Sequence, residues 1–219
     1  MKVVLTRAVE GSGSLAKRLR AAGFDVEECP LVRIERVDGP PVRAEDYEWV
    51  VLTSRIAVEE LFKRLEGPLP RVAVIGPGTA EALREHGVEP ALVPLRSTQE
   101  GLLEALARPA GRVLFAGAEG ARDLLARELG ADVVVLYRTH ELRPDEFPDG
   151  DLVVLASASA ARALAGLGVD RACVSIGPVT SEEARRHGLR VVAEAPTSDL
   201  DGLVAAVKLA ASSGGSSRS

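Results

Sequence analysis

The sequence predicts an α/β fold of two Rossmann/flavodoxin-like domains, each with a parallel sheet of five strands, joined by a two-stranded linker. Short apolar runs alternate with helical stretches along the chain, which is typical of parallel sheets covered by helices. Runs such as 49–52 and 152–155 have no polar alternation, so we expect them to be buried on both faces. Several segments also occur twice in the same order, which indicates two related domains.

The expected strands share short, β-branched apolar runs: 3–6, 25–29, 49–53, 72–76, 91–94, 112–116, 131–136, 151–156, 172–176 and 190–194. The expected helices are the amphipathic stretches between them: 12–22, 55–65, 79–86, 98–107, 119–129, 158–166, 180–187 and 199–211. Glycine, which readily ends a helix, follows five of these stretches: Gly23, Gly87, Gly130, Gly168 and Gly188.

The repeat sets the domain boundaries. Residues 72–82 resemble 173–184, with Gly76-Pro77 and Gly177-Pro178 lying 101 residues apart. The first copy continues into strands at 112–116 and 131–136, whereas the second copy reaches the C-terminus without them. Their counterparts are the strands at 3–6 and 25–29, so the N-terminus completes the second copy.

This arrangement predicts a discontinuous domain, residues 1–34 and 141–219, and a continuous domain, residues 38–136. The linker, residues 35–37 and 137–140, is extended and is expected to pair as a two-stranded ladder. The Ser- and Gly-rich tail, residues 212–219, is expected to be flexible.

Composition excludes several classes of protein. The 219 residues are 46% hydrophobic, which favours cored domains over disorder. A net charge of −5 argues against nucleic-acid binding. Cys29 and Cys173 form neither a disulfide scaffold nor a metal-ligand pattern. The chain opens directly into a strand and has no apolar run long enough for a membrane helix, so we expect a cytoplasmic protein.

Candidate ligand contacts follow from the sheets. Ligands of open parallel sheets bind at the carboxyl ends of the strands, and here these ends are rich in Gly, Ser and Thr at helix starts. Helix N-termini attract anions through their free N–H groups, so two such edges facing across a hinge would line a cleft with donors. The candidate binding residues are Arg7, Ser54, Gly76, Thr79, Thr98, Gly117, Ser157, Gly177, Thr180 and Thr197. Tyr137 lies at the domain junction.

Each candidate also has a purely structural interpretation. The Ser and Thr residues are typical helix N-caps, and the glycines are typical of turns. Arg7 fits an ordinary surface arginine, and Tyr137 fits a packed hinge residue. The symmetric recurrence of Ser54 with Ser157, and of Thr79 with Thr180, favours a shared pocket. The chain contains no nucleotide-binding glycine loop, zinc motif or Ser-His-Asp pattern.

Seven segments together resemble the uroporphyrinogen-III synthase family: 5–7, 52–54, 75–80, 136–139, 155–157, 176–180 and 195–197. The resemblance covers residues 2–208 and includes the discontinuous two-domain plan. The sequence departs from the family at Arg55, where an Asn is more usual, and at Ala156, where a Thr is common.

The resemblance implies a cofactor-independent and metal-independent hydro-lyase of haem and tetrapyrrole biosynthesis. Such an enzyme cyclises hydroxymethylbilane to uroporphyrinogen III, losing water and inverting ring D through a spiro intermediate. The candidate residues would then bind the acidic side groups of the substrate, and Tyr137 would assist departure of the hydroxyl group. A monomer is expected, without nucleic-acid or membrane partners and with at most transient contact to the preceding pathway enzyme. The alternative is a non-catalytic anion-binding or regulatory module with the same two-lobed fold.

Overall fold

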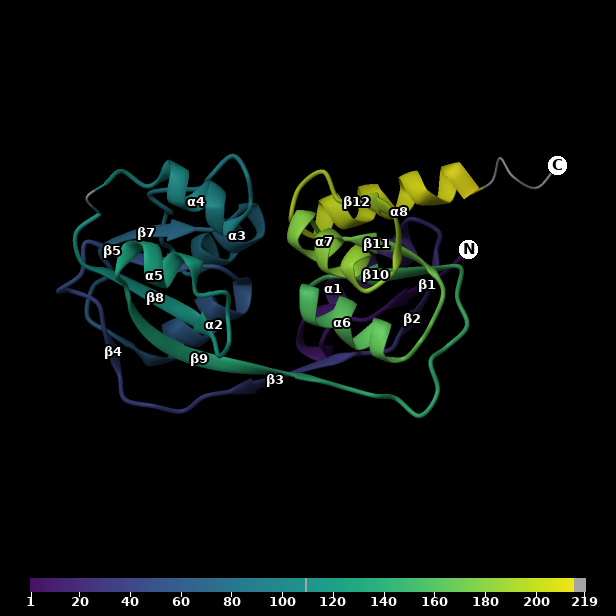
Figure 1. Cartoon of the computed structure of the whole chain (residues 1–219), viewed down its shortest axis with the longest axis horizontal. Helices are drawn as coiled ribbons and strands as arrows, with labels where there is room; N and C mark the ends of the chain where they lie inside the picture. Colours follow the sequence, from purple (N-terminus) through teal and green to yellow (C-terminus); the bar gives the residue numbers. More distant parts are fainter. Residues whose placement is uncertain (109, 215–219) are drawn as a thin grey trace. The chain divides into compact units, whose positions relative to one another are not determined.

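The computed structural model describes residues 1–108 and 110–214. The chain divides into two compact units, and Figure 1 labels the elements of both. Unit 1 combines Met1–Ile34 with His140–Ser219, and unit 2 is Glu35–Thr139. Unit 1 is therefore discontinuous in sequence, whereas unit 2 is a single stretch of chain.

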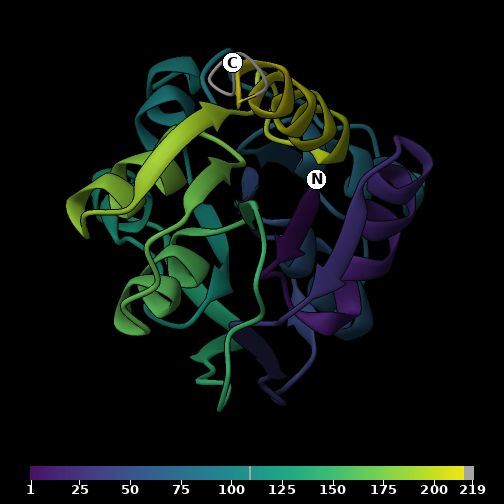
Figure 2. The same ribbon diagram turned by 90° about the vertical axis from the view of Figure 1, so that its right-hand side faces the viewer.

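Unit 1 contains a five-stranded sheet in the order β12-β11-β10-β1-β2. Its strands are β1 (Lys2–Leu5), β2 (Asp25–Glu28), β10 (Leu152–Leu155), β11 (Ala172–Ser175) and β12 (Arg190–Glu194). All neighbouring strands are parallel, and Val3 pairs with Leu152 across β1 and β10. In Figure 2 the purple N-terminal strands lie beside the green strands of the later segment in one sheet.

Helices cover both faces of this sheet. Helices α1 (Val9–Ala21) and α8 (Leu200–Gly214) pack on one face, and α6 (Ala158–Gly166) and α7 (Pro178–Arg186) pack on the other. Val3 and Leu5 join the core beneath α1 and α8, whereas Val4 joins the core beneath α6 and α7. The unbroken apolar run of β1 therefore contributes side chains to the cores on both faces of the sheet.

Unit 2 contains a second sheet in the order β3-β9-β8-β5-β7. Its strands are β3 (Val32–Arg36), β5 (Trp49–Leu52), β7 (Arg71–Val74), β8 (Val113–Ala118) and β9 (Asp132–Glu141). The pairs β5–β7, β5–β8 and β8–β9 are parallel. A separate short pair, β4 (Val42–Arg43) with β6 (Leu65–Glu66), was not expected from the sequence.

Four helices accompany the sheet of unit 2 in the described residues. Helices α4 (Gln99–Ala105) and α5 (Leu124–Leu129) pack together and share a core with Trp49 and Val51. Helices α2 (Arg55–Arg64) and α3 (Pro77–Glu85) also pack together, and α2 contacts β8. In unit 2, α2 follows β5 and α3 follows β7, as α6 follows β10 and α7 follows β11 in unit 1.

The strands β3 and β9 are hydrogen-bonded neighbours, and each spans the sequence boundary between the units. In unit 2 the Val37 N–H donates to the Leu136 carbonyl at 2.9 Å, and in unit 1 the Leu142 N–H donates to the Leu31 carbonyl at 2.8 Å. The predicted fold class, two five-stranded α/β units joined by paired extended segments, is confirmed.

The strand predicted at 91–94 was wrong. This segment makes only an isolated bridge, Ala73 to Leu92, and β3 supplies the fifth strand instead. Pro90 and Pro94 flank the bridge and cannot donate backbone hydrogen bonds. The matching segment of unit 1 has no proline within β12, and there the Ala195 N–H donates to the Ser175 carbonyl at 2.9 Å.

The helix predicted at 119–129 is shorter, because Gly120 adopts the left-handed conformation and α5 starts only at Leu124. The tail prediction also needs correction, since α8 continues through residue 214; residues 215–219 lie outside the described residues. The predicted glycine stops are confirmed by positive φ angles at Gly23, Gly87, Gly130, Gly168 and Gly188.

Candidate functional site

Serine caps a helix at the carboxyl edge of each sheet. Ser54 follows β5, and its Oγ accepts a hydrogen bond from the Ala57 N–H at 3.0 Å. Ser157 follows β10, and its Oγ accepts from the Ala160 N–H at 3.1 Å. The predicted capping role is therefore present in both copies, and each hydroxyl has a further partner: the Ser54 Oγ is 2.9 Å from the Tyr137 Oη, and the Ser157 Oγ is 3.0 Å from the Ser159 Oγ.

Thr79 and Thr180 are not caps, because the N-cap positions of α3 and α7 are Gly76 and Gly177. The threonines lie in the first helical turns and are only 6% and 4% exposed. Among the described residues, neither hydroxyl makes a hydrogen bond. Because neither Oγ1 is among the buried atoms that lack a partner, each hydroxyl reaches the surface, where a ligand could bind it.

The two N-cap glycines owe their identity to a neighbouring serine. Gly76 and Gly177 have φ angles of 179° and 166°, which is extended backbone open to any residue. A Cβ on Gly76 would lie 2.5 Å from the Ser97 Oγ, and one on Gly177 would lie 2.8 Å from the Ser198 Oγ. A serine side chain of the same unit therefore occupies the space beside each glycine.

Ser97 and Ser198 lie beside these glycines but are not among the residues predicted from the sequence. Both lie in the loop that leads into the next helix, at the same carboxyl edge as the glycines. The signal was present in the repeat, since the segments starting at these two serines match. Each edge thus combines a capping serine, a helix-start glycine, a buried threonine and a second serine.

The remaining predicted threonines differ from each other. Thr98 caps α4, with its Oγ1 accepting from the Gly101 N–H at 3.0 Å. Thr197 donates its hydroxyl to Asp199 Oδ1 at 3.0 Å, and that oxygen accepts from the Gly202 N–H at 2.7 Å in α8. Asp199, which the sequence analysis missed, holds the place that Thr98 holds in unit 2.

Tyr137 and Ser54 are brought together inside unit 2. Tyr137 lies near the middle of β9, is 7% exposed, and its Oη is 2.9 Å from the Ser54 Oγ. Burial raises the pKa of the Tyr137 phenol, and the hydrogen bond with Ser54 opposes that rise only in part. The phenol is therefore a neutral hydroxyl at physiological pH.

Gly117 and Arg7 occupy comparable places in the two sheets. Gly117 lies in β8, where an added Cβ would contact the Phe115 ring at 3.3 Å. Arg7 follows β1 and is half-buried. The preceding residue, Thr6, is fully buried and donates its hydroxyl to the Val154 carbonyl at 2.8 Å.

The arginines at the edge of unit 2 are already paired with carboxylates. Arg96 contacts Glu104 at 2.5 Å, and Arg138 contacts Glu119 at 2.7 Å. Arg55 reaches both Glu81 and Glu85, at 3.0 and 2.8 Å. These three arginines are thus engaged with carboxylates of the same unit.

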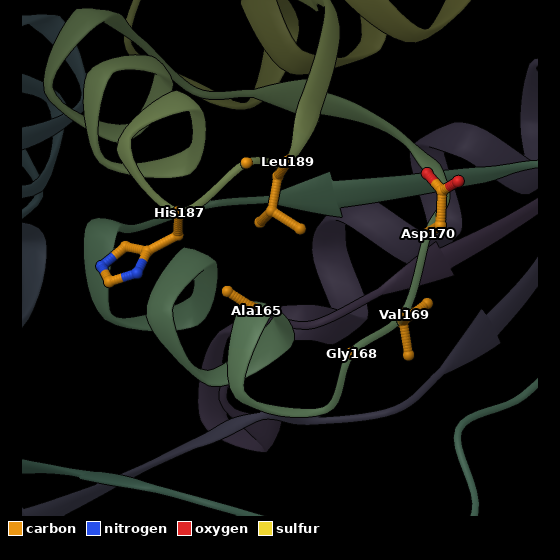
Figure 3. A pocket seen from close by; sticks show the side chains of 7 residues that line it. Ala165, Gly168, Val169, Asp170, His187 and Leu189 are labelled. Carbon is orange, nitrogen blue, oxygen red and sulfur yellow. The ribbon is translucent and has the colours of Figure 1, made fainter.

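No predicted site residue lines either of the two hollows found in unit 1. One, of about 200 Å³, is lined by Ala165, Val169, Asp170, His187 and Leu189 with two glycines, and lies at the amino ends of β11 and β12 (Figure 3). The other lies beside Lys2, Glu27 and Cys29. Among the described residues there is no cluster suited to a metal ion and no helix that could span a membrane.

A comparison with protein-family models shows to which family the chain belongs. Residues 13–205 match the family model described as uroporphyrinogen-III synthase HemD.

The chain belongs to the uroporphyrinogen-III synthase family.

Curated relatives agree along nearly the whole chain. It is 30% identical to the uroporphyrinogen-III synthase of Synechococcus elongatus, covering 94% of each chain. It is 28% identical to the chloroplastic uroporphyrinogen-III synthase of rice, Oryza sativa, covering 94% of this chain and 79% of the rice protein. Membership in the uroporphyrinogen-III synthase family makes the chain a hydro-lyase of tetrapyrrole biosynthesis.

Solved structures with the uroporphyrinogen-III synthase fold agree in architecture. A mutant uroporphyrinogen III synthase from Thermus thermophilus matches with a TM-score of 0.66 at 18% identity, covering 97% of this chain and 99% of that one. The Helicobacter pylori enzyme matches with a TM-score of 0.63 at 16% identity, covering 96% and 98%. At these identities the likeness concerns the fold.

Proposed function

We propose that this chain cyclises hydroxymethylbilane to uroporphyrinogen III, with loss of water and inversion of ring D, by holding the acidic side groups of the substrate at the carboxyl edges of its two sheets. The observation that carries this proposal is the repeated donor set. A buried threonine and a glycine–serine contact lie at the start of α3 in unit 2 and at the start of the equivalent helix, α7, in unit 1.

Neutral donors suit this substrate. Each carboxylate can accept backbone N–H bonds at the start of α3 or α7, where the helix dipole also favours an anion. The free hydroxyls of Thr79 and Thr180 would add donors beside those N–H groups. Because the nearby arginines of unit 2 are engaged with glutamates, the binding energy comes from fixed dipoles, which also fix the position of the chain.

Tyr137 is proposed as the acid that assists dehydration. Tyr137 gives its proton to the departing hydroxyl, and the C–O bond of the hydroxymethyl group breaks to release water. The pyrrole nitrogen supplies the electrons and loses its own N–H proton, which restores the phenol, so that the neutral azafulvene forms. Ring D then attacks through its substituted carbon, and the spiro intermediate rearranges to the inverted isomer. A buried, protonated phenol is suited to donate this proton to the leaving hydroxyl, and the hydrogen bond with Ser54 holds the phenol in place.

The azafulvene closes unaided to the non-inverted isomer, so the main contribution of the protein is positioning. The proposal includes a monomer in the cytoplasm that works without metal or organic cofactor. The alternative, a non-catalytic anion-binding or regulatory module, differs in one measurable respect: it would not change the ratio of isomers.

An isomer assay tests the function. Freshly made hydroxymethylbilane is incubated with the chain, and the oxidised products are separated by chromatography. We expect isomer III to dominate, whereas the enzyme-free control gives isomer I. Isomer I as the main product in both samples would reject the synthase and favour the binding module.

Ser157→Asp and Ser157→Ala separate binding from capping. Aspartate caps a helix as well as serine, whereas alanine loses about 1 kcal/mol. We therefore expect Ser157→Asp to keep the thermal stability of the parent and still raise KM, because its charge repels the acidic substrate. An unchanged KM in Ser157→Asp would leave Ser157 with capping alone.

A further inference from the structure

Unit 1 contains a chain of three polar side chains beneath its carboxyl edge. Ser175 ends β11, Ser181 lies in the first turn of α7, and Glu194 ends β12. The Oγ atoms of Ser175 and Ser181 are 2.5 Å apart, and Ser181 donates its hydroxyl to the Glu194 carboxylate. Because that carboxylate only accepts, Ser175 must donate to Ser181, so the chain has one direction.

Both serines are completely buried, whereas Glu194 is exposed at its outer end. Hydrogen bonds to a charged group are stronger than neutral ones, and they strengthen the bonds linked to them. The network therefore fixes three elements against each other: the end of β11, the start of α7 and the end of β12.

Unit 2 shows that the fold does not need this network. The strand registers and the matching helices place Val74, Ala80 and Val93 at the three equivalent positions. Val74 and Ala80 are buried, so apolar side chains fill the same space there. Because the polar groups occur in unit 1 and not at the equivalent positions of unit 2, they indicate a role other than stabilising the fold.

The network surrounds two of the proposed binding residues. Ser175 lies two residues before Gly177, and Ser181 directly follows Thr180. The Ser181 N–H also donates to the Gly177 carbonyl at 3.0 Å. Any shift of Ser181 would therefore move the backbone donors at the start of α7.

We propose that Glu194, acting through Ser181 and Ser175, is a positioning group that holds Gly177 and Thr180 in the orientation that binds an acidic group of the substrate. This inference rests on the proposed function. It makes unit 1 the more rigid of the two anion-binding edges, since unit 2 has only van der Waals contacts at these positions.

The test transplants the apolar set of unit 2 into unit 1. The variant Ser175→Val/Ser181→Ala/Glu194→Val leaves no buried hydroxyl unpaired, so we expect it to fold with a thermal midpoint close to that of the parent. We expect KM for hydroxymethylbilane to rise about tenfold while kcat changes by less than about threefold, because positioning for binding is lost. Glu194→Gln alone, which keeps an acceptor oxygen, should have a KM close to that of the parent.

The outcomes separate the two claims. A parent that forms isomer III beside a triple variant with unchanged KM overturns the positioning role and leaves the function standing. A triple variant and Glu194→Gln that are equally impaired also overturn it, since conservative rescue then fails. A parent that gives only isomer I overturns the function, and this inference with it.

Discussion

Gly76 and Gly177 show how a residue can be fixed by a neighbour instead of by its own backbone. Their φ angles suit any amino acid, but the hydroxyls of Ser97 and Ser198 occupy the space of a Cβ. The same contact recurs in both units. It ties the start of α3 or α7 to the loop before the following helix, α4 or α8.

Gly177→Ala should lower stability by about 1–3 kcal/mol through overpacking, and Ser198→Ala should restore most of that loss in the double variant. With the Oγ removed, the nearest remaining atom of residue 198 is its Cβ, 3.8 Å away, which is ordinary contact. Chemical denaturation of the four proteins of this double-mutant cycle measures the coupling. Additive effects would contradict the proposed contact.

Gly76→Ala provides the matched comparison in unit 2. Here the Ser97 Cβ itself would lie 3.0 Å from the new methyl group, so Ser97→Ala should rescue only partly.

Tyr137→Phe should lower kcat about a hundredfold, at the lower end of the range for general acid catalysis. Because the pKa of the Tyr137 phenol lies above its usual value of 10, the phenol stays mostly protonated up to pH 10. Its ionisation should therefore not reduce activity between pH 7 and 10. The measurement is kcat against pH for parent and variant. A parent that loses activity through a group titrating near pH 8 would point to another acid.

The same pKa shift predicts a stability effect. Because the folded-state pKa lies above the unfolded value, the contribution of Tyr137 is complete below pH 10 and is lost as pH rises through the folded pKa. Tyr137→Phe should therefore flatten the alkaline decline in the free energy of unfolding.

At the scale of elements, helix ends are set by glycine. Gly130 ends α5 with a φ of 58°, and Gly120 delays the start of that helix with a φ of 65°. Gly13 is different, since it lies within α1, is exposed, and has nothing within 4 Å of an added Cβ. One kind of residue thus defines elements at some positions and weakens them at another.

Gly13→Ala should stabilise the protein by about 0.5–1 kcal/mol, because alanine has the better helix propensity and restricts the unfolded chain. Gly130→Ala should destabilise it by about 1 kcal/mol, since its left-handed conformation disfavours a Cβ. Thermal unfolding of both variants gives opposite shifts if the two roles are correct. Shifts of the same sign would refute this distinction.

Strands and helices were largely predictable from sequence because buried parallel strands and glycine stops leave clear local patterns. Segment 91–94 was not, because its apolar pattern was right and only the missing N–H groups of Pro90 and Pro94 prevented a strand. The edges of the site were predictable through the repeat. The contacts of Ser97 and Ser198, the pairing of Ser54 with Tyr137 and the Ser175 network depend on distances across the fold, which no local pattern encodes.

At the scale of the whole molecule, the two units divide the chain unequally. Unit 2 is a continuous stretch, Glu35–Thr139, whereas unit 1 depends on pairing between β1 and β10, about 150 residues apart. Exposed ion pairs such as Arg43–Glu66 and Arg84–Glu89 contribute little to stability individually. Stability therefore resides in the separate cores of the two units.

Val153→Asp and Val50→Asp test this independence at equivalent, fully buried positions of β10 and β5. Burying a carboxylate should unfold the unit that contains it. In hydrogen-exchange mass spectrometry, Val153→Asp should remove protection from residues 2–31 as well as from 152–207, while residues 49–116 stay protected. Val50→Asp should give the reverse pattern. Loss of protection throughout the chain in both variants would show a single cooperative unit.

The pairing of β1 with β10 also sets the order in which a newly made chain can fold. A ribosome adds about 5–20 residues per second, so β1 waits roughly 7–30 s for β10 to be synthesised. During that interval β1 can pair with β2 but has no strand on its other side, and the flanking charges of Lys2 and Arg7 are of the kind that keep such an edge from self-association. The unit that is begun first on the ribosome is thus the one that is finished last.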